Sequence, residues 1–208
     1  MKLVLLGANG QTGKLVLEAV LAKDIDVTAV VRSADKAPDL QHKSLQVMVG
    51  DPCDPVFLTS VFRDHDAVIS ALGGRLPSKV ATSVYYRSTV AIVEAASVTG
   101  LKRVLVTSTA LLFPNQTLLG KLLRFVVPNA VRSAGRMDKI LKRPGPDWTS
   151  ARAGFLNDVS VATYRAQREA LPENSTAVSR LALAQFLITA ISNSETQGAA
   201  YGVSQAST

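Results

Sequence analysis

The stretch Leu5-Leu6-Gly7-Ala8-Asn9-Gly10-Gln11-Thr12-Gly13-Lys14 decides the fold of this chain. It joins an apolar run, Lys2–Leu6, to an amphipathic pattern over Lys14–Ala22. Its three glycines are spaced three residues apart. Glycine permits the positive φ of a tight strand-to-helix turn, and it leaves the backbone open to a close anion. The stretch therefore predicts a strand, a glycine loop and a helix.

The glycine loop has a specific chemistry at that place. The amino end of a helix offers free N–H groups and the positive end of its dipole to an anion. Asn9 and Thr12 either add hydrogen bonds to a phosphate or tighten the turn. Glycine spacing alone also occurs in plain structural turns, but the strand before it and the helix after it favour a loop that binds a dinucleotide pyrophosphate.

Apolar runs of strand length alternate with helical patterns along the rest of the chain. We expect strands at Lys2–Leu6, Val27–Val31, Leu45–Val49, Ala67–Ala71, Arg103–Val106, Trp148–Ala151 and, as a short addition, Ala200–Val203. We expect helices at Lys14–Ala22, Pro55–Phe62, Ala81–Val98 and Ser179–Ser192, with a looser helical region over Leu118–Leu141. This alternation is typical of βαβ units. It predicts a single-domain α/β Rossmann fold over residues 1–208, doubly wound and mostly parallel, with strand order 3-2-1-4-5-6 and room for a seventh strand.

Composition narrows the class of protein. With 208 residues, 47% of them apolar, the chain suits one compact domain. Its single cysteine, Cys53, forms no internal disulfide, which favours a reducing cytoplasm. No export signal is expected, because only four apolar residues separate Lys2 from the glycine loop. No metal site is expected, because neither His42 nor His65 has a second ligand at a suitable spacing.

The net charge of +7 is compatible with several kinds of anionic partner and does not identify one of them. The basic residues are spread along the chain, with a modest cluster from Lys121 to Arg143, and no aromatic residues alternate with them. Attraction of a polyanionic cofactor, or plain solvation, explains the charge more simply than nucleic acid does. We therefore expect a small-molecule acceptor as partner, no nucleic acid and no membrane, and a monomer or homodimer.

The end of the second predicted strand distinguishes the two nicotinamide dinucleotides. NAD-specific Rossmann folds usually place Asp or Glu there, to hold the ribose 2′-hydroxyl. This chain has Arg32 followed by Ser33. A guanidinium grips a 2′-phosphate bidentately, so NADP(H) is favoured over NAD(H), although a solvated surface arginine remains the alternative. After the third strand, Asp51 either accepts a hydrogen bond from adenine or caps the following turn.

These features together resemble one family. They are the glycine loop, the Arg32 corner, Gly50-Asp51, the turn Ala71-Leu72-Gly73-Gly74 and the strand end Val106-Thr107-Ser108-Thr109. The chain resembles an atypical short-chain dehydrogenase/reductase of the NAD(P)H-binding, NmrA-like type. Within that family it is most similar to the small flavin reductase and biliverdin-IXβ reductase group. The resemblance covers essentially the whole chain, through Val178-Ser179-Arg180.

The resemblance implies roles for residues by position. It implies pyrophosphate contacts from Gly7, Asn9, Gly10, Gln11, Thr12 and Gly13, 2′-phosphate contacts from Arg32 and Ser33, and adenine contacts from Asp51 and Pro52. It implies a ribose path along Ala71, Leu72, Gly73 and Thr107, with Gly154 and Phe155 near the carboxamide and the substrate. It implies that Ser108, Thr109 and Lys139 are the candidate catalytic residues. From the residues alone, Ser108 and Thr109 equally suit strand-end capping, and Lys139 a solvated helix face.

One departure from the family limits the chemistry. Better-known members use a tyrosine and a lysine four residues later as a general acid pair. Here Gly135 stands four residues before Lys139, and the tyrosines are followed four residues later by Thr89, Val90, Arg168 and Gln205. Unactivated ketones need a positioned proton donor, whereas flavins and quinones accept hydride with little help.

The function expected from the sequence is therefore an NADPH-dependent reductase of a flavin, a quinone or a similar conjugated acceptor. The alternative is a non-catalytic NADP(H)-binding redox sensor that acts through a protein partner. A nucleotide-sugar epimerase is disfavoured, since little chain follows Trp148 to form a substrate portion. Tyr85, Tyr86 and Phe113 either line an acceptor site or pack as ordinary helix residues.

Overall fold

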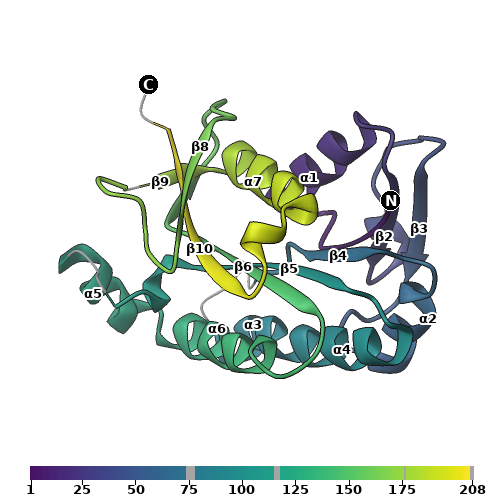
Figure 1. The fold of residues 1–208 in the computed structure, drawn as a ribbon, viewed down its shortest axis with the longest axis horizontal. Coiled ribbons are helices and arrows are strands. Elements are labelled where there is room, and N and C mark those ends of the chain that lie inside the picture. Colours follow the sequence, from purple (N-terminus) through teal and green to yellow (C-terminus); the bar gives the residue numbers. More distant parts are fainter. Residues whose placement is uncertain (74–77, 115–117, 176, 207–208) are drawn as a thin grey trace.

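The computed structural model describes residues 1–73, 78–114, 118–175 and 177–206. They form one eight-stranded sheet between two layers of helices (Figure 1), in the order β3-β2-β1-β4-β5-β6-β10-β8. The strands are β1 (Lys2–Leu6), β2 (Asp26–Val31), β3 (Leu45–Val49), β4 (Ala67–Ser70), β5 (Arg103–Thr109), β6 (Asp147–Ala153), β8 (Tyr164–Arg168) and β10 (Ala199–Gln205). All neighbours run parallel except β8, which is antiparallel to β10. The predicted fold class and the order 3-2-1-4-5-6 are confirmed, with β10 as the seventh strand and β8 as an unpredicted edge.

Helices cover both faces of the sheet, as Figure 1 shows. On one face, α1 (Gln11–Leu21) and α7 (Arg180–Ser192) pack on Leu3, Leu5 and Ile69. On the other, α2 (Pro55–Phe62), α4 (Val84–Thr99) and α6 (Pro128–Leu141) pack on Val4, Val68 and Val104. Successive residues of each strand therefore point to opposite faces of the sheet, and both faces are covered by helices. For this reason the central strands are continuous apolar runs in the sequence. None of the helices in the described part of the chain is long and apolar enough to cross a bilayer.

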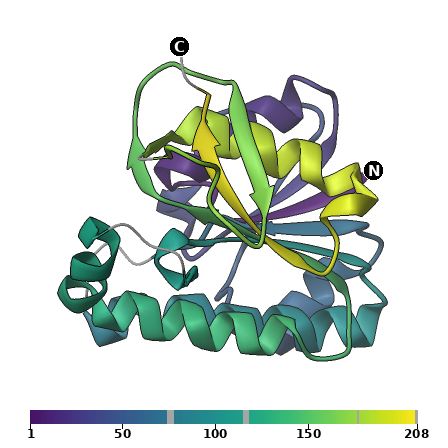
Figure 2. The same cartoon turned by 60° about the vertical axis from the view of Figure 1, so that its left-hand side comes forward.

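Shorter elements surround the carboxyl ends of the strands. They are the helices α3 (Lys79–Thr82) and α5 (Leu118–Val126), the 3₁₀ turns η1 (Ala34–Lys36) and η2 (Ala110–Leu112), and a two-stranded ribbon of β7 (Phe155–Asn157) and β9 (Ala177–Ser179). A third 3₁₀ turn, η3 (Ser194–Thr196), lies at the opposite, amino ends, where Thr196 contacts Arg103 and Thr149. Figure 2 shows α5 at the end of α6 and beside η2, not over the sheet itself.

Element boundaries differ from the sequence expectations for local reasons. The first helix begins at Gln11 rather than Lys14, because Gly10 is already its N-cap. The fifth strand continues past Val106 to Thr109, because the polar residues at its end keep pairing with β6 through Thr109↔Ala153. The expected helix over 81–98 divides into α3 and α4 at Ser83. Strands β7, β8 and β9 were not predicted, since they are short or polar.

A buried arginine joins the sheet to the end of α7. Arg103 donates to the carbonyl oxygens of Ala190 (2.8 Å) and Ile191 (3.3 Å) in the last turn of that helix. It also donates to the hydroxyls of Thr149 and Thr196, both at 2.7 Å. Burial lowers the pKa of Arg103 to about 10, although the charge of Asp147 opposes the shift. The cation therefore satisfies carbonyls that a helix end leaves without partners.

Candidate dinucleotide and acceptor site

The glycine loop lies where β1 ends, against the end of β4. Gly7 has a φ of +87°, and a Cβ there would stand 3.0 Å from the carbonyl carbon and oxygen of Ala71. The N–H of Gly10 donates to the carbonyl oxygen of Gly7 at 2.9 Å. The turn thus needs glycine at position 7 for both its conformation and its close contact with the neighbouring chain.

Gly13 holds the first helix against the same turn. A Cβ on Gly13 would lie only 2.0 Å from the carbonyl oxygen of Gly7, so no larger residue fits. The N-cap, Gly10, supplies no side-chain hydrogen bond, and the first turn of α1 carries no acidic residue. The amino end of α1 therefore keeps bare N–H groups and a positive dipole end, and it fits the pyrophosphate of a dinucleotide.

The Arg32 corner lies beside this loop. The side-chain amide of Asn9 donates to the carbonyl oxygen of Lys36, which places η1 against the glycine loop. Arg32, directly after β2, is exposed, and Ser33 is the N-cap of η1. The Ser33 hydroxyl and then Lys36 lower the pKa of Asp35 by hydrogen bonding to its carboxylate. Of the two roles that the sequence allowed for Asn9, its hydrogen bond to Lys36 agrees with the one that tightens the turn.

The third strand leads into a capped turn. Asp51 accepts a hydrogen bond from the N–H of Cys53 at 2.9 Å, so it caps this turn as the second sequence reading expected. Pro52 is buried, and Asp51 itself is exposed. Burial, followed by the charge of Asp51, raises the pKa of the Cys53 thiol. The cysteine is thus poorly disposed to act as a nucleophile.

The fourth strand end supplies the next part of the groove. Ala71 and Leu72 are half-buried and Gly73 is exposed, while Gly74 of the same predicted turn lies outside the described residues. The N–H of Ala71 donates to the carbonyl oxygen of Leu6 at 2.9 Å, which keeps this turn beside the glycine loop. The glycine loop and the turn after β4 are thus brought together at the carboxyl ends of these two neighbouring strands.

The end of β5 presents three hydroxyls in succession. That of Thr107 donates to the carbonyl oxygen of Ser70 at 3.4 Å, and that of Thr109 accepts from the N–H of Leu111 at 3.2 Å. Thr109 therefore caps η2, as one sequence reading expected. The Ser108 hydroxyl is buried without a hydrogen-bond partner in the described parts of the chain. Buried hydroxyls are usually hydrogen-bonded, so the unsatisfied hydroxyl distinguishes Ser108 from its two neighbours.

Beside Ser108 lies an ion pair that was not predicted. Arg152 pairs with Ser108 in the sheet register and binds the carboxylate of Asp138 on α6. Its guanidinium carbon lies 4.5 Å from the centre of the Phe113 ring. Asp138 falls on the apolar side of α6, four residues after buried Ala134, and that position was the signal that sequence reasoning missed.

Other predicted site residues are placed around this strand end. Lys139 is exposed on α6, one residue after the buried carboxylate. Gly154 and Phe155 are exposed where the chain leaves β6 and enters β7. Tyr85 and Tyr86 are partly buried and pack against the core, and Phe113 is buried. Of the two roles that the sequence allowed for these aromatic residues, their burial agrees with ordinary packing.

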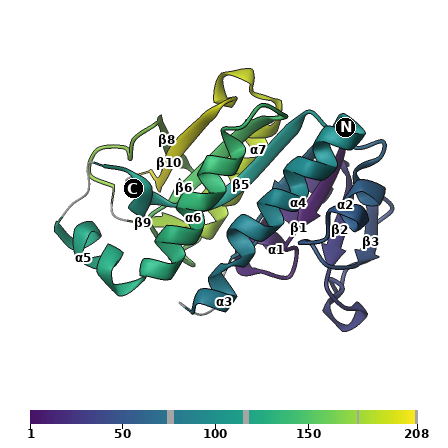
Figure 3. The same cartoon turned by 90° about the horizontal axis from the view of Figure 1, so that it is seen from below.

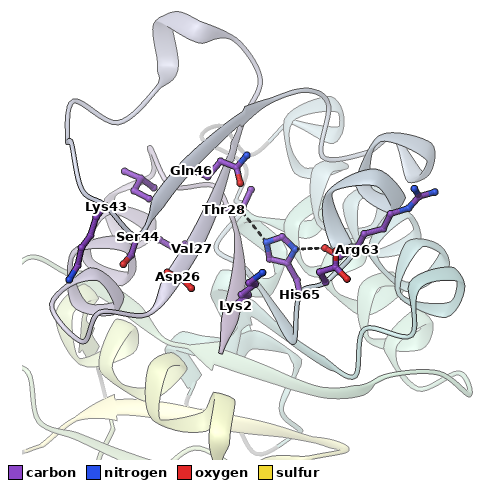
Figure 4. Close-up of a pocket in the computed structure, with 11 residues that line it drawn as sticks. Lys2, Asp26, Val27, Thr28, Lys43, Ser44, Gln46, Arg63 and His65 are labelled. Carbon is purple, nitrogen blue, oxygen red and sulfur yellow. Dashed lines mark hydrogen bonds between the residues drawn. The ribbon is translucent and has the colours of Figure 1, made fainter.

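Two cavities open at the opposite, amino ends of the strands. One of about 370 Å³ lies at the amino ends of β1, β2 and β3, lined by Lys2, Asp26, Val27, Thr28, Lys43, Ser44, Leu45, Gln46, Arg63, Asp64 and His65. Figure 4 shows His65 and Thr28 turned toward each other, with His65 Nε2 2.9 Å from the Thr28 hydroxyl. His65 Nδ1 lies 2.9 Å from the carbonyl oxygen of Arg63, which only accepts, so that nitrogen carries a proton. This histidine is a structural link between strand and loop.

Comparisons with known proteins agree with this geometry. A family model described as NAD(P)H-binding matches residues 7–194. The photosystem II assembly factor Ycf39 of Guillardia theta is 31% identical over 105 residues, which are 50% of this chain and 33% of that protein. An uncharacterised chloroplastic protein of Arabidopsis thaliana is 30% identical over 169 residues, 76% of this chain and 60% of that protein. The chain thus spans between 33% and 60% of the length of these relatives.

Solved structures share the fold over the whole chain. The oxidoreductase ylbE from Lactococcus lactis superposes with a TM-score of 0.84 at 19% identity, covering 100% of this chain and 92% of that one. ChuY, an anaerobillin reductase from Escherichia coli O157:H7, superposes with a TM-score of 0.76 at 24% identity, covering 100% and 98%. The match of the family model over the glycine loop, the strand ends and α7 settles the family, and the chain belongs to the NAD(P)H-binding family of Rossmann-fold proteins.

Proposed function

We propose that this protein is a reductase that uses NADPH to reduce a flat conjugated acceptor such as a flavin or a quinone. The proposal rests on one observation: two features that suit phosphates lie side by side at the carboxyl ends of β1 and β2. The uncapped amino end of α1 with its glycine cradle lies beside a corner that presents Arg32 to solvent. In NADPH the pyrophosphate and the 2′-phosphate are attached to the same adenosine ribose, at its 5′ and 2′ positions, and these two neighbouring features suit that arrangement.

The cofactor groove follows the carboxyl ends of the strands. Gly7, Gly10 and Gly13 with the helix N–H groups hold the pyrophosphate, and Arg32 with Ser33 holds the 2′-phosphate. Asp51 and Pro52 flank the adenine, and the groove continues along Ala71, Leu72, Gly73 and Thr107. Arg32 is favoured for a phosphate because a guanidinium donates two parallel hydrogen bonds to phosphate oxygens.

The acceptor lies beyond, at the ends of β5 and β6. Reduced nicotinamide supplies a hydride to the acceptor when it is bound. Ser108, whose buried hydroxyl has no partner in the described ranges, is free to orient an acceptor carbonyl or ring nitrogen. α6 carries Gly135 four residues before Lys139, so the chain offers no tyrosine as an acid there. A flavin or quinone needs no such acid, and solvent supplies the last proton.

A fold neighbour supports a reductase over other Rossmann chemistries, and Cys53 bears on the compartment. A fold neighbour that covers the whole chain, ChuY, is named as a reductase. The single thiol, half-buried and with a raised pKa, suits a reducing compartment, which we take to be the cytoplasm.

A direct assay tests the proposal. Purified protein is mixed with NADPH and either FMN or a water-soluble quinone, and the absorbance of the reduced nicotinamide is followed. We expect turnover with at least one acceptor and a clear preference for NADPH over NADH. Tight NADPH binding without turnover across flavins and quinones would instead favour a redox sensor that acts through a protein partner.

A further inference from the structure

Exposed apolar side chains gather at one end of the molecule. On α5, Leu122 and Phe125 are 61% and 83% exposed, and Val126 is exposed as well. These three residues are spaced i, i+3 and i+4, so they share one side of the helix. The chain around β7 adds Phe155, Leu156 and Val159, which are also exposed. Figures 1, 2 and 3 all place α5 and the ribbon of β7 and β9 at this end. We call these six residues the apolar end.

The apolar end flanks the proposed acceptor position. α5 follows β5 through η2, and β7 follows β6 after a single residue, Gly154. Both elements therefore continue from the strand ends that carry Ser108 and Arg152. Clusters of exposed apolar side chains of this kind mark interaction sites rather than ordinary exposure.

On α5 and α6 the exposed charge is positive, whereas Asp158 beside β7 is an exposed carboxylate paired with Arg180. Arg124 is exposed on α5, and Arg132, Arg136 and Lys139 are exposed on α6 at i, i+4 and i+7, along one side of that helix. Between Leu118 and Pro146 the sequence has one carboxylate, Asp138, which is buried against Arg152. No exposed acidic residue therefore balances these cations within the two helices.

We infer that α5 docks on a lipid surface with anionic headgroups. A short helix with an exposed apolar side and adjacent cations lies in the plane of such an interface, with its apolar side below the headgroups. A second copy of the chain suits the surface less well, because a twofold contact would bring Arg124 and the α6 cations against their own copies. An anionic headgroup layer neutralises them instead. The sequence alone predicted no membrane partner, because the exposure of Leu122 and Phe125 cannot be read from it.

The docking also defines the acceptor class, and this part rests on the proposed function. An acceptor that dissolves in the lipid, a quinone, would enter between α5 and β7 from the interface. NADPH delivers one hydride, which is two electrons and a proton, to the quinone. One further proton from water completes the hydroquinone, and NADP⁺ leaves. Water-soluble acceptors would reach the same strand ends without the lipid.

The test compares two matched double variants. Leu122→Ser with Phe125→Ser removes two exposed apolar side chains from the apolar end. Val56→Ser with Val98→Ser removes two from α2 and α4, where Val56 and Val98 are similarly exposed. Each protein is sedimented with vesicles of phosphatidylcholine, with or without about a third phosphatidylglycerol. We expect the native protein and the valine variant to bind the anionic vesicles, and the α5 variant to bind about tenfold or more weakly. Added salt should weaken binding, as should Arg124→Gln with Arg132→Gln.

The outcomes separate the docking from the chemistry. Absent binding to anionic vesicles, or equal losses in the two double variants, overturns the docking. So does a dimer of the lipid-free native protein that the α5 variant alone dissociates, because the apolar end would then be a contact between copies. In the α5 variant, turnover of a quinone embedded in vesicles should fall with vesicle binding, by a larger factor than turnover with FMN in the absence of vesicles. Vesicle binding without turnover of any acceptor leaves the docking supported and overturns the proposed function and the quinone assignment.

Discussion

Asp138 of α6 and Arg152 of β6 form an ion pair almost fully removed from water, with side-chain exposures of 11% and 8%. The pair joins the helix to the sheet beside Ser108, and the Phe113 ring covers the guanidinium. Asp138 Oδ1 and Arg152 Nε have no partner in the described ranges of the chain. Burial raises the pKa of Asp138, and the attraction of Arg152 opposes this only in part.

Removing the carboxylate should destabilise the protein strongly. Asp138→Ala leaves the Arg152 charge buried and unpaired, which typically costs about 3–5 kcal/mol. Asp138→Asn keeps the shape and one oxygen acceptor, so its cost should be clearly smaller. Urea unfolding followed by circular dichroism measures both. Equal free energies of unfolding for native protein and Asp138→Ala would mean that the pair does not hold α6 to the sheet.

The same carboxyl should leave a signature in the pH dependence of stability. Its pKa is higher in the folded than in the unfolded protein, so between the two values the folded state binds more protons. The stability that it contributes is complete below the unfolded pKa of about 4 and is lost as the pH rises through the folded pKa. The stability difference between native protein and Asp138→Asn should therefore shrink from pH 4 toward neutrality. A difference that grows over that range would contradict the raised pKa.

Gly13 should tolerate no side chain. Gly13→Ala places a Cβ against the carbonyl oxygen of Gly7, so the turn must open or α1 must shift. We expect NADPH binding to be lost or weakened at least about tenfold, since the pyrophosphate cradle depends on that approach. Gly135→Ala is the matched control, because its Cβ would meet only a Leu112 methyl at 3.8 Å. It should stabilise α6 by about 0.5–1 kcal/mol and leave binding unchanged. Isothermal titration with NADPH compares the two variants.

The parts of the fold that follow from local sequence were predictable. The helix Pro55–Phe62 was placed correctly, because Asp54 caps it and Pro55 occupies its first turn. The glycine loop and the strand order followed from the spacing of Gly7, Gly10 and Gly13 after a strand. The edge strand β8 was missed, because Tyr164–Arg168 is polar and its pairing with Gln205 and its neighbours is set by the fold of the whole chain.

The site was predictable where it depends on backbone and not where it depends on long-range contacts. Sequence spacing identified the glycine loop that a phosphate requires. It did not show that Asn9 reaches Lys36, because that contact joins segments 27 residues apart. The pairing of Asp138 with Arg152 across the strand end was likewise invisible, although the carboxylate falls within an apolar helical repeat. Tertiary packing decides both contacts.

Arg32 should determine which dinucleotide is preferred. Arg32→Asp replaces a cation by an anion at the corner that we assign to the 2′-phosphate. NADPH affinity should fall about 10- to 100-fold, the scale of charge-assisted hydrogen bonds, while NADH affinity changes little. Exposed Arg63→Asp introduces the same charge change away from the glycine loop and serves as the control. Equal losses for both nucleotides would remove the reason to assign NADP(H).

Cys53 gives a chemical probe of the adenine end of the groove. Burial and the neighbouring charge of Asp51 raise the pKa of its thiol, so less thiolate is present at pH 8 than in a free cysteine. Alkylation by iodoacetamide, followed by mass spectrometry, should therefore be slower than that of glutathione. Asp51→Asn removes the charge but keeps an oxygen for the Cys53 N–H, so it should speed the reaction. If Asp51 and Pro52 flank the adenine, saturating NADPH should slow alkylation further in the native protein. A rate that NADPH leaves unchanged would place the adenine elsewhere, even if the Asp51→Asn result agrees with the raised pKa.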